Sequence, residues 1–215
     1  MGISGGPNMI EDGLVLSLDA ADRNSYPGSG TIWNDVSGNG YSGNLTNGPI
    51  FSNNVIVFDG VDDYVNFSTN NLVVNTISLW IYIKNVVNGA IIYSGSDLYN
   101  SGFWEWSIYI YNGTIYFRAK VDVNTAIYNA SDYLNTWKNF TLIRNFNSKS
   151  YLYENGLYKT ESAEFSSTNT NQLRLCKSGG NYSSINASKI QVYSRALSAQ
   201  EVLQNYNATK TRFGL

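Results

Sequence analysis

The 215-residue chain contains no histidine, one cysteine and three prolines, and these shortages exclude several kinds of site. Without histidine, neither a Ser-His-Asp nor a Cys-His catalytic arrangement can form. The single Cys176 has no partner for an intrachain disulfide, so the chain is not a disulfide-stapled secreted scaffold. Its neighbours Leu173–Leu175 read as a strand, where a thiol without an activating neighbour is inert.

Charge and long apolar runs are also scarce. Charged residues make up 14% of the chain, the formal net charge is -2, and the 14 lysines and arginines are scattered. Nucleic acids and anionic membranes need a clustered basic face, so neither is expected as a partner. No stretch approaches the ~18 consecutive apolar residues of a membrane span, so no membrane insertion is expected. The start, MGISGGPNMIEDG, lacks the basic and apolar regions of a signal peptide, so none is expected.

Tyrosine, glycine and asparagine are abundant, with 17 Tyr and 19 Gly. Asn and Gly favour turns with positive φ, whereas Tyr, Val and Ile favour strands, as in a β protein with a polar surface. The most informative segment has two short strands, Val55–Phe58 and Tyr64–Phe67, on either side of an acidic turn. A third strand follows, with isoleucine or leucine at every second position from Ile77 to Ile83. A period of two predicts strands with one face on a core.

Many further strands are predicted along the chain. Leu14 begins a similar alternation, and residues 20–54 are expected to form ordered loops with at most short strands. Others are predicted at residues 90–94, 103–111, 114–119, 126–130, 137–144, 150–154, 157–160, 173–176 and 189–193. Asn112-Gly113 and Asn155-Gly156 stand between strand formers, which predicts type I′ hairpin turns. Short strands at spacings near ten residues favour a sandwich over alternating β and α units.

One helix is predicted near the carboxyl end. Ser198 and Glu201 have the spacing of a capping box. The helix is expected to run from Ala199 to about Asn205.

The chain is expected to form one domain with two loose ends. Glycine and proline break any regular structure within residues 1–12, which are expected to be a flexible arm. The domain is expected to span residues 13–207, and residues 208–215 to form a tail. Ends without a core of their own can order on a partner, so both are expected docking elements.

Four blocks in a fixed order resemble a known family. They are LVLSLDAADRNSYPGSGTIWNDVSGNG from Leu14, FDGVDDYV ending at Val65 with the following TISLWIYI, WKNFTLI from Trp137 with the later YLYENG, and IQVYSRALSAQEV from Ile190. Together they resemble the laminin-G-like branch of the concanavalin A-like lectin/glucanase superfamily, over roughly residues 13–207. The resemblance implies an all-β fold, a jelly-roll sandwich of two antiparallel sheets with one short C-terminal helix.

The catalytic pattern of the family's glucanase branch is missing. That branch places E-x-D-x-x-E along one strand, which supplies the two carboxylates that glycoside hydrolysis needs. The nearest candidate is Glu105, but Ser107 and Ile110 stand at the later acidic positions. Glu161 and Glu164 form another close pair, which a solvated loop explains. The chain is therefore expected not to be an enzyme.

Calcium is the cofactor that the resemblance implies, since laminin-G-like domains often hold Ca²⁺ at the sandwich rim through six to eight oxygens. The implied ligands in this chain are Asp19, Asp35, Asp62 and Asp63. The chain departs from the pattern before its closing strand, where many relatives are acidic and Lys189 would repel a cation. The alternative is that these aspartates cap turns through hydrogen bonds to the backbone.

A loop near the middle of the chain has residue types suited to sugars, because aromatic rings stack on sugar faces and polar groups bond hydroxyls. The candidate carbohydrate-binding residues are Asp97, Tyr99, Asn100, Trp104 and Trp106. The alternative is that aromatics at alternating strand positions pack in the interior. Interior packing is expected of Trp80 and Trp137, which occupy the family's packing positions.

The closing segment from Val202 to Leu215 resembles the ends of lectin-like structural proteins from tailed bacteriophages. Assembly into a virion in the host cytoplasm requires neither a signal peptide nor disulfides. The leading hypothesis is a non-enzymatic, lectin-like structural protein of a tailed-phage virion, a capsid decoration or appendage that adheres to host-surface glycans. It would contact other virion proteins at the virion surface, as a homo-oligomer or in many copies. The alternatives are a free bacterial carbohydrate-binding module and a purely structural decoration protein without a ligand.

Overall fold

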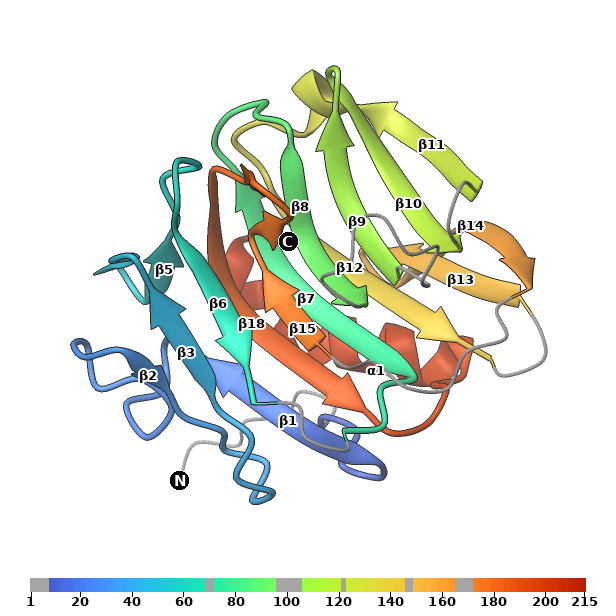
Figure 1. Cartoon of the computed structure of the whole chain (residues 1–215). Coiled ribbons are helices and arrows are strands. Elements are labelled where there is room, and N and C mark those ends of the chain that lie inside the picture. Colours follow the sequence, from blue (N-terminus) through green and yellow to red (C-terminus); the bar gives the residue numbers. More distant parts are fainter. Residues whose placement is uncertain (1–7, 69–71, 96–105, 121–122, 146–148, 165–171) are drawn as a thin grey trace.

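The computed structural model describes residues 8–68, 72–95, 106–120, 123–145, 149–164 and 172–215. The described strands form two eight-stranded sheets, here sheet A and sheet B, and one small hairpin. All strand pairs within these sheets are antiparallel. Figure 1 shows sheet B in front of sheet A. The predicted all-β jelly-roll of two antiparallel sheets is confirmed.

Sheet A has the order β14-β13-β12-β7-β18-β5-β4, and β1 also pairs with β18. Its strands are β1 (Leu14–Asp19), β4 (Ile50–Ser52), β5 (Val55–Val57), β7 (Thr76–Ile83), β12 (Trp137–Arg144), β13 (Lys149–Glu154), β14 (Leu157–Glu164) and β18 (Ile185–Tyr193). The closing strand β18 therefore lies beside the opening strand β1, which brings the two ends of the domain together.

Sheet B has the order β11-β10-β9-β8-β15-β6-β3-β2. Its strands are β2 (Ile32–Trp33), β3 (Gly43–Thr46), β6 (Tyr64–Phe67), β8 (Gly89–Gly95), β9 (Trp106–Tyr111), β10 (Thr114–Lys120), β11 (Val123–Asn129) and β15 (Gln172–Leu175). The hairpin consists of β16 (Lys177–Ser178) and β17 (Asn181–Tyr182). The short strands β2, β3 and β4 agree with the expectation for residues 20–54.

The core lies between the two sheets and follows from the period of two. In β7 the isoleucines and leucine that begin at Ile77 are all buried and belong to this core. Sheet B supplies Trp106, Ile108 and Ile110 from β9 and Phe117 from β10. Burying apolar area of this kind contributes about 25 cal/mol per Å², which makes it the main favourable term in folding.

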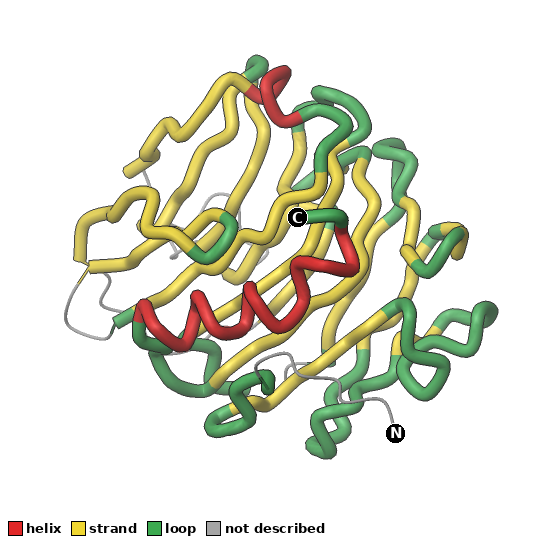
Figure 2. The backbone as a smooth tube through the Cα atoms, turned by 180° about the vertical axis from the view of Figure 1, so that it is seen from behind, coloured by secondary structure: helices red, strands yellow, loops and turns green. Residues whose placement is uncertain are grey.

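A helical segment covers the outer face of sheet A. It consists of α1 (Ala199–Thr209) followed by the 3-10 helix η2 (Lys210–Phe213), and Figure 2 shows it lying across the strands. Trp80 on β7 is 2% exposed, stacks on the Phe213 ring at 4.0 Å and donates through Nε1 to Thr209 Oγ1 at 2.9 Å. Trp80 is thus buried as expected, but beneath the helix rather than between the sheets.

The ends of the domain are more ordered than the sequence predicts. The capping box of Ser198 and Glu201 is confirmed, but α1 ends at Thr209 and η2 continues to Phe213. Part of the predicted arm also contacts the helix, because Ile10 N donates to Asn205 Oδ1 at 2.9 Å. Another 3-10 helix, η1, spans Ala130–Tyr133. Among the helices that the structure describes, none has the length and apolar composition needed to cross a bilayer.

Candidate glycan-binding face and acidic turn

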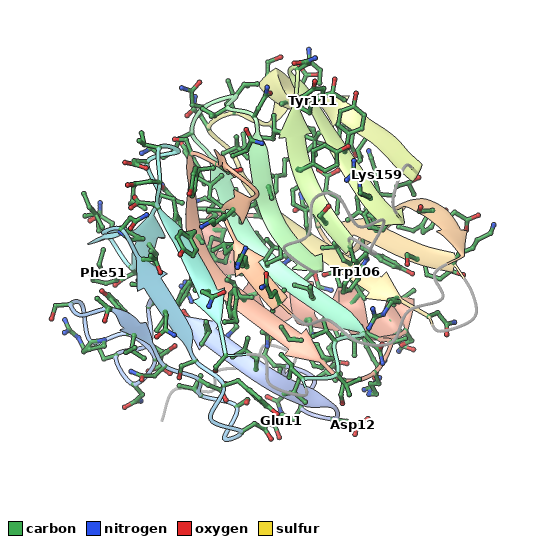
Figure 3. All side chains as sticks on the ribbon, viewed as in Figure 1. Glu11, Asp12, Phe51, Trp106, Tyr111 and Lys159 are labelled. Carbon is green, nitrogen blue, oxygen red and sulfur yellow. The ribbon has the colours of Figure 1, made fainter. Side chains whose placement is uncertain are left out.

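Trp106 is the one predicted carbohydrate-binding residue within the described chain, and it faces the core. Its side chain is 0% exposed, and it shares the inward face of β9 with Ile108 and Ile110. Figure 3 labels Trp106 near one end of this strand and Tyr111 near the other. Burial removes Trp106 from contact with a glycan, so the structure corrects this assignment. The other four candidates, Asp97, Tyr99, Asn100 and Trp104, lie outside the described residues.

The opposite face of β9 and β10 carries a tyrosine pair that sequence reasoning missed. Asn112 and Gly113 both have positive φ, and their turn sets Tyr109 directly opposite Tyr116. The two rings stack with centroids 5.2 Å apart and planes 16° apart, and the Arg118 guanidinium lies 5.0 Å from the Tyr109 centroid. These three residues are called the Tyr109 cluster. The predicted type I′ turn was the signal that could have revealed it, since that turn fixes the register of the hairpin.

A second aromatic group lies on the same sheet, and it is called the Tyr64 cluster. Val65 and Phe67 of β6 face the core, so Tyr64 lies on the outer side. Lys177 Nζ is 4.0 Å from the Tyr64 ring centroid and 5.6 Å from that of Tyr182, and the two rings are 6.3 Å apart. Cation–π contacts of this kind hold the ammonium over partly exposed rings.

The hairpin β16–β17 brings Lys177 and Tyr182 to this position. Gly89 of β8 allows the hairpin to pack there, because a Cβ at Gly89 would lie 2.5 Å from the Tyr182 carbonyl carbon. A side chain at this glycine would therefore displace the hairpin and the cluster with it.

Polar side chains continue outward from the Tyr64 cluster across neighbouring strands. Asn66 lies opposite Arg174 of β15 on one side and opposite Asn44 of β3 on the other. Arg174 Nε donates to Asn66 Oδ1 at 3.4 Å. Ser107 of β9 pairs with Arg118 of β10 on one side and with Tyr93 of β8 on the other, and Tyr93 in turn pairs with Arg174 of β15. Ser107 is only 2% exposed. The outer face of sheet B therefore has two accessible parts, one around Tyr109 and one around Tyr64 and Arg174.

The chemistry of both parts suits sugars. Tyrosine rings offer flat apolar surfaces with a polar tip. Asparagine amides both donate and accept hydrogen bonds, and guanidinium groups donate several. Ligand sites in proteins commonly combine apolar surface with a few convergent polar groups of these types.

The acidic turn between β5 and β6 brings together two of the four predicted calcium ligands. Within the described residues, Asp59, Asp62 and Asp63 form a group in which one carboxylate oxygen from each residue lies within 4.8 Å of the other two. Asp63 is 4% exposed, and burial raises the pKa of its carboxyl, with the charges of Asp59 and Asp62 adding to the effect. Carboxylates are ligands that Ca²⁺ prefers, so this donor set fits a hard cation. Asp19 and Asp35 are not members of the group.

Asp35 instead holds its own loop together. Its Oδ1 accepts from Ser17 N at 2.8 Å and from Ser37 N at 2.9 Å. Its Oδ2 accepts from Ser37 Oγ at 2.7 Å and from Gly40 N at 3.0 Å. The three bonds from Ser37 and Gly40 match the turn-capping alternative for this residue, and the bond from Ser17 ties the loop to β1.

Asp19 binds two cationic side chains. Its two oxygens accept from Arg212 Nη1 at 2.7 and 2.9 Å, and Lys189 Nζ lies 3.2 Å from Oδ2. Burial alone would raise the pKa of Asp19, but the charges of Lys189 and Arg212 outweigh it and hold the pKa below its ordinary value. A carboxylate neutralised by a lysine and an arginine is a poor ligand for a metal cation, because both would repel the ion.

Comparisons with solved structures show the same fold in proteins of low sequence identity. The Trypanosoma rangeli sialidase in complex with sialic acid matches at 14% identity over 92% of this chain and 33% of its own, with a TM-score of 0.73. The botulinum neurotoxin serotype D binding domain matches at 20% identity over 93% of this chain and 52% of its own, with a TM-score of 0.69. The chain thus spans about a third to a half of these structures. A comparison with curated proteins gave no match.

A family comparison covers most of the jelly-roll. The profile described as "Concanavalin A-like lectin/glucanases superfamily", of the laminin G type, matches residues 59–203. The matched region begins at the acidic turn, includes the Tyr109 cluster, and ends within α1. With the two-sheet fold and this match together, the chain belongs to the concanavalin A-like lectin/glucanase superfamily.

Proposed function

We propose that this chain is a non-enzymatic, lectin-like domain that binds glycans on the outer face of sheet B. The observation that carries the proposal is the pairing of tyrosine rings with cationic and amide groups at two places on that face. The helix α1 lies over sheet A and not over sheet B (Figures 1 and 2). Stacking on the rings and hydrogen bonds to the polar groups would orient the sugar.

The proposal that the chain binds glycans without hydrolysing them rests on the side chains that the strands of sheet B carry. Glycoside hydrolysis needs two carboxylates on either side of the scissile bond. The eight strands of sheet B contain no aspartate or glutamate in their sequences. A glycan lying over these strands would therefore meet no acid–base pair from the strands themselves. Incubation with each bound glycan, followed by chromatography, should recover the glycan intact.

The first test is a glycan array with the purified chain and with Tyr109→Ala/Tyr116→Ala. Aromatic contacts contribute about 0.5–1.5 kcal/mol each beyond their buried area, so the double variant should lose roughly tenfold in affinity for the best glycan. Tyr158→Ala is the matched control, because Tyr158 is 55% exposed on β14 of sheet A. Equal binding by both variants would place the site elsewhere, and no binding by the native chain, even when clustered, would reject the lectin proposal.

The same array run with Ca²⁺ and with EDTA tests the cofactor. Calcium at the acidic turn would make binding sensitive to EDTA and to Asp62→Asn. Asp62 is exposed, so this substitution should leave the fold intact. Binding that EDTA does not alter would keep the lectin and remove calcium from the mechanism.

The setting that we propose is the surface of a tailed-phage virion, as a capsid decoration or an appendage in contact with other virion proteins. The support is the resemblance of the closing segment to phage structural proteins. Display in many copies would make weak glycan binding useful, since avidity rises by orders of magnitude. Mass spectrometry of purified particles should find the chain in multiple copies. If the chain is absent from the particles, a free bacterial carbohydrate-binding module is favoured. If the chain is present in the particles but binds no glycan, a purely structural decoration protein is favoured.

A further inference from the structure

The chain contains five Asn-Gly pairs, and this dipeptide deamidates more readily than other asparagine sequences. In the reaction, the backbone nitrogen of the glycine attacks the side-chain carbonyl carbon of the asparagine, Cγ. Glycine favours the attack because it has no Cβ to hinder its nitrogen. The asparagines are Asn39, Asn47, Asn88, Asn112 and Asn155, and all five lie within the described residues. Since glycine follows each of them, the structure around each pair determines which one reacts.

Hydrogen bonds hold the amide nitrogens of the first two asparagines. Asn39 Nδ2 donates to Leu14 O at 3.2 Å and to Ser37 Oγ at 3.0 Å. Asn47 Nδ2 donates to Asp62 O at 2.8 Å. In both cases the nitrogen that would leave as ammonia is bonded, so these contacts oppose the rotation of the amide that ring closure requires.

Two further asparagines are held through the amide oxygen. Asn88 Oδ1 accepts from Asn112 N at 2.9 Å, and Asn155 Oδ1 accepts from Asn139 N at 3.0 Å. The glycine that follows each of these two asparagines is buried. The fold therefore restrains both the amide and the attacking nitrogen at these pairs.

Asn112 differs from the other four, because its amide is exposed and makes no hydrogen bond within the part of the chain that the structure describes. Other atoms of its turn make the contacts. Asn112 N donates to Asn88 Oδ1, and Gly113 O accepts from Ala130 N at 2.7 Å. A Cβ at Gly113 would meet nothing within 4 Å, so the space beside the attacking nitrogen is open. Figure 3 labels Tyr111, the residue before this turn, near the end of the hairpin.

We propose that Asn112 is the residue at which the folded chain deamidates, and that the product alters the β9–β10 hairpin. Gly113 N forms a bond to Asn112 Cγ, and the bond from Cγ to Nδ2 breaks. Ammonia leaves with the amide nitrogen and the proton of Gly113 N, and a succinimide ring remains. One water molecule then opens the ring at either of its two C–N bonds, which gives aspartate or isoaspartate. The reaction uses water alone and does not depend on glycan binding.

The two products should affect the hairpin differently. Aspartate keeps the turn, because Asp-Gly also suits a type I′ turn, and adds one negative charge. Isoaspartate directs the backbone through Cβ, so the two-residue turn becomes one atom longer. That turn fixes the register in which Tyr109 lies opposite Tyr116. Isoaspartate at position 112 should therefore loosen the Tyr109 cluster.

The experiment incubates the purified chain at mildly alkaline pH and measures conversion at all five asparagines by peptide mass spectrometry. Water enriched in heavy oxygen labels the product, because the new carboxyl takes one oxygen atom from the solvent. The chain unfolded in guanidinium chloride is the matched control, since the five pairs then keep their Asn-Gly chemistry and lose their folded contacts. Asn112→Gln is the control variant, because the longer side chain closes its ring far more slowly.

A hydrogen bond of about 1 kcal/mol corresponds to roughly a fivefold difference in rate. We therefore expect Asn112 to convert roughly fivefold faster than each of the other four in the folded chain. In the unfolded chain the five rates should be similar. Equal rates in the folded chain, or the same order of rates after unfolding, would overturn the assignment.

Hydrogen exchange then measures the effect on the hairpin. The isoaspartate form is separated by chromatography and compared with the fresh chain. Amides of β9 and β10 should exchange faster in the isoaspartate form, whereas incubation of Asn112→Gln should leave their exchange unchanged. Unaltered exchange in the isoaspartate form would overturn the proposed effect on the hairpin.

Discussion

Asp19 joins three segments that are distant in the sequence. It ends β1, and its carboxylate binds Lys189 of β18 and Arg212 of η2. Arg212 also donates to Ser188 Oγ, which ties the carboxyl end to the closing strand. Replacement of Asp19 by Asn would leave both cations without a carboxylate. We expect Asp19→Asn to lower the free energy of unfolding at neutral pH by roughly 1–3 kcal/mol, the usual contribution of hydrogen bonds to charged groups.

The contribution of Asp19 should depend on pH in a defined direction. Its folded-state pKa lies below the ordinary value of 3.8, because Lys189 and Arg212 outweigh the effect of burial. A carboxyl whose pKa is lowered by folding stabilises the protein above its unfolded-state pKa, and this contribution is lost as the pH falls through the folded-state value. Urea unfolding should therefore show a higher free energy of unfolding for the native chain than for Asp19→Asn at neutral pH. This difference should shrink as the pH falls below 3.8 and through the lowered folded-state pKa. Asp132→Asn, which changes an exposed side chain, is the control and should unfold like the native chain. A difference between native and Asp19→Asn that does not change with pH would contradict the ion-pairing role of Asp19.

Individual residues were predicted from the sequence where their role is local. The alternating pattern marks which residues of β7 face the core. Asp35 was predicted as a calcium ligand, and its bonds to Ser37 and Gly40 match the turn-capping alternative instead. Trp106 was assigned to a ligand because its residue type suits sugars, yet its position on β9 gives it the inward face. Asp19 could not be assigned, because Arg212 lies 193 residues away and no local pattern links them.

At the level of elements, the two Asn-Gly hairpins provide a matched pair. Both turns occur where predicted, with positive φ at Gly113 and Gly156. A Cβ at Gly113 would meet nothing within 4 Å, whereas one at Gly156 would lie 3.0 Å from Tyr206 Cβ in α1. The β13–β14 turn is therefore packed against the helix, and the β9–β10 turn is not.

Alanine substitutions at these two glycines should separate backbone strain from helix packing. Gly113→Ala should cost about 1–2 kcal/mol, since a left-handed conformation disfavours a Cβ by that amount. Gly156→Ala should lower the free energy of unfolding by about 1–3 kcal/mol more than Gly113→Ala does, because the added methyl overpacks the contact with α1. Thermal or urea unfolding measures both, and equal losses would mean that Tyr206 moves aside without a cost.

Strands were easier to predict than the carboxyl-terminal helix. Period-two patterns and Asn-Gly turns are local signals, so strand positions follow from them. The predicted helix stopped at about Asn205, because the following residues show no clear apolar face. Its continuation is stabilised by tertiary contacts, since Trp80 bonds Thr209 and stacks on Phe213, and Tyr193 Oη accepts from Asn205 Nδ2. Such contacts override local propensity.

At the scale of the whole molecule, the two sheets have different surroundings. Sheet A is covered by α1 and η2, which bury Trp80, whereas the outer face of sheet B carries the two tyrosine clusters. Both described ends of the chain lie on the helix side, because Asn8 O accepts from Gln204 Nε2 and Arg212 binds Asp19. A domain attached through its ends would thus present the proposed glycan-binding face away from the attachment.

The carboxyl end is part of this architecture, and its removal is the last prediction. Deleting residues 210–215 would remove the Phe213 ring from between Trp80 and Trp137 and the Arg212 partner of Asp19. Fully burying a Phe side chain contributes about 1.5–3 kcal/mol, and Phe213 is partly buried, so it contributes a part of this. The truncated chain should therefore unfold at lower urea, with a shifted tryptophan emission. Phe213→Leu should lose less, because it keeps apolar contact and forfeits only the stacking of about 0.5–1.5 kcal/mol.

An unchanged unfolding curve after truncation would mean that the segment is a free tail, as the sequence alone suggests. If the truncated chain is destabilised instead, deletion cannot separate docking from folding in a virion. Leu215→Asp then becomes the informative variant, because Leu215 is 48% exposed and its side chain can change without disturbing the Phe213 contacts. Reduced incorporation of a fully stable Leu215→Asp chain would identify the carboxyl end as a docking element, and normal incorporation would assign docking to another surface.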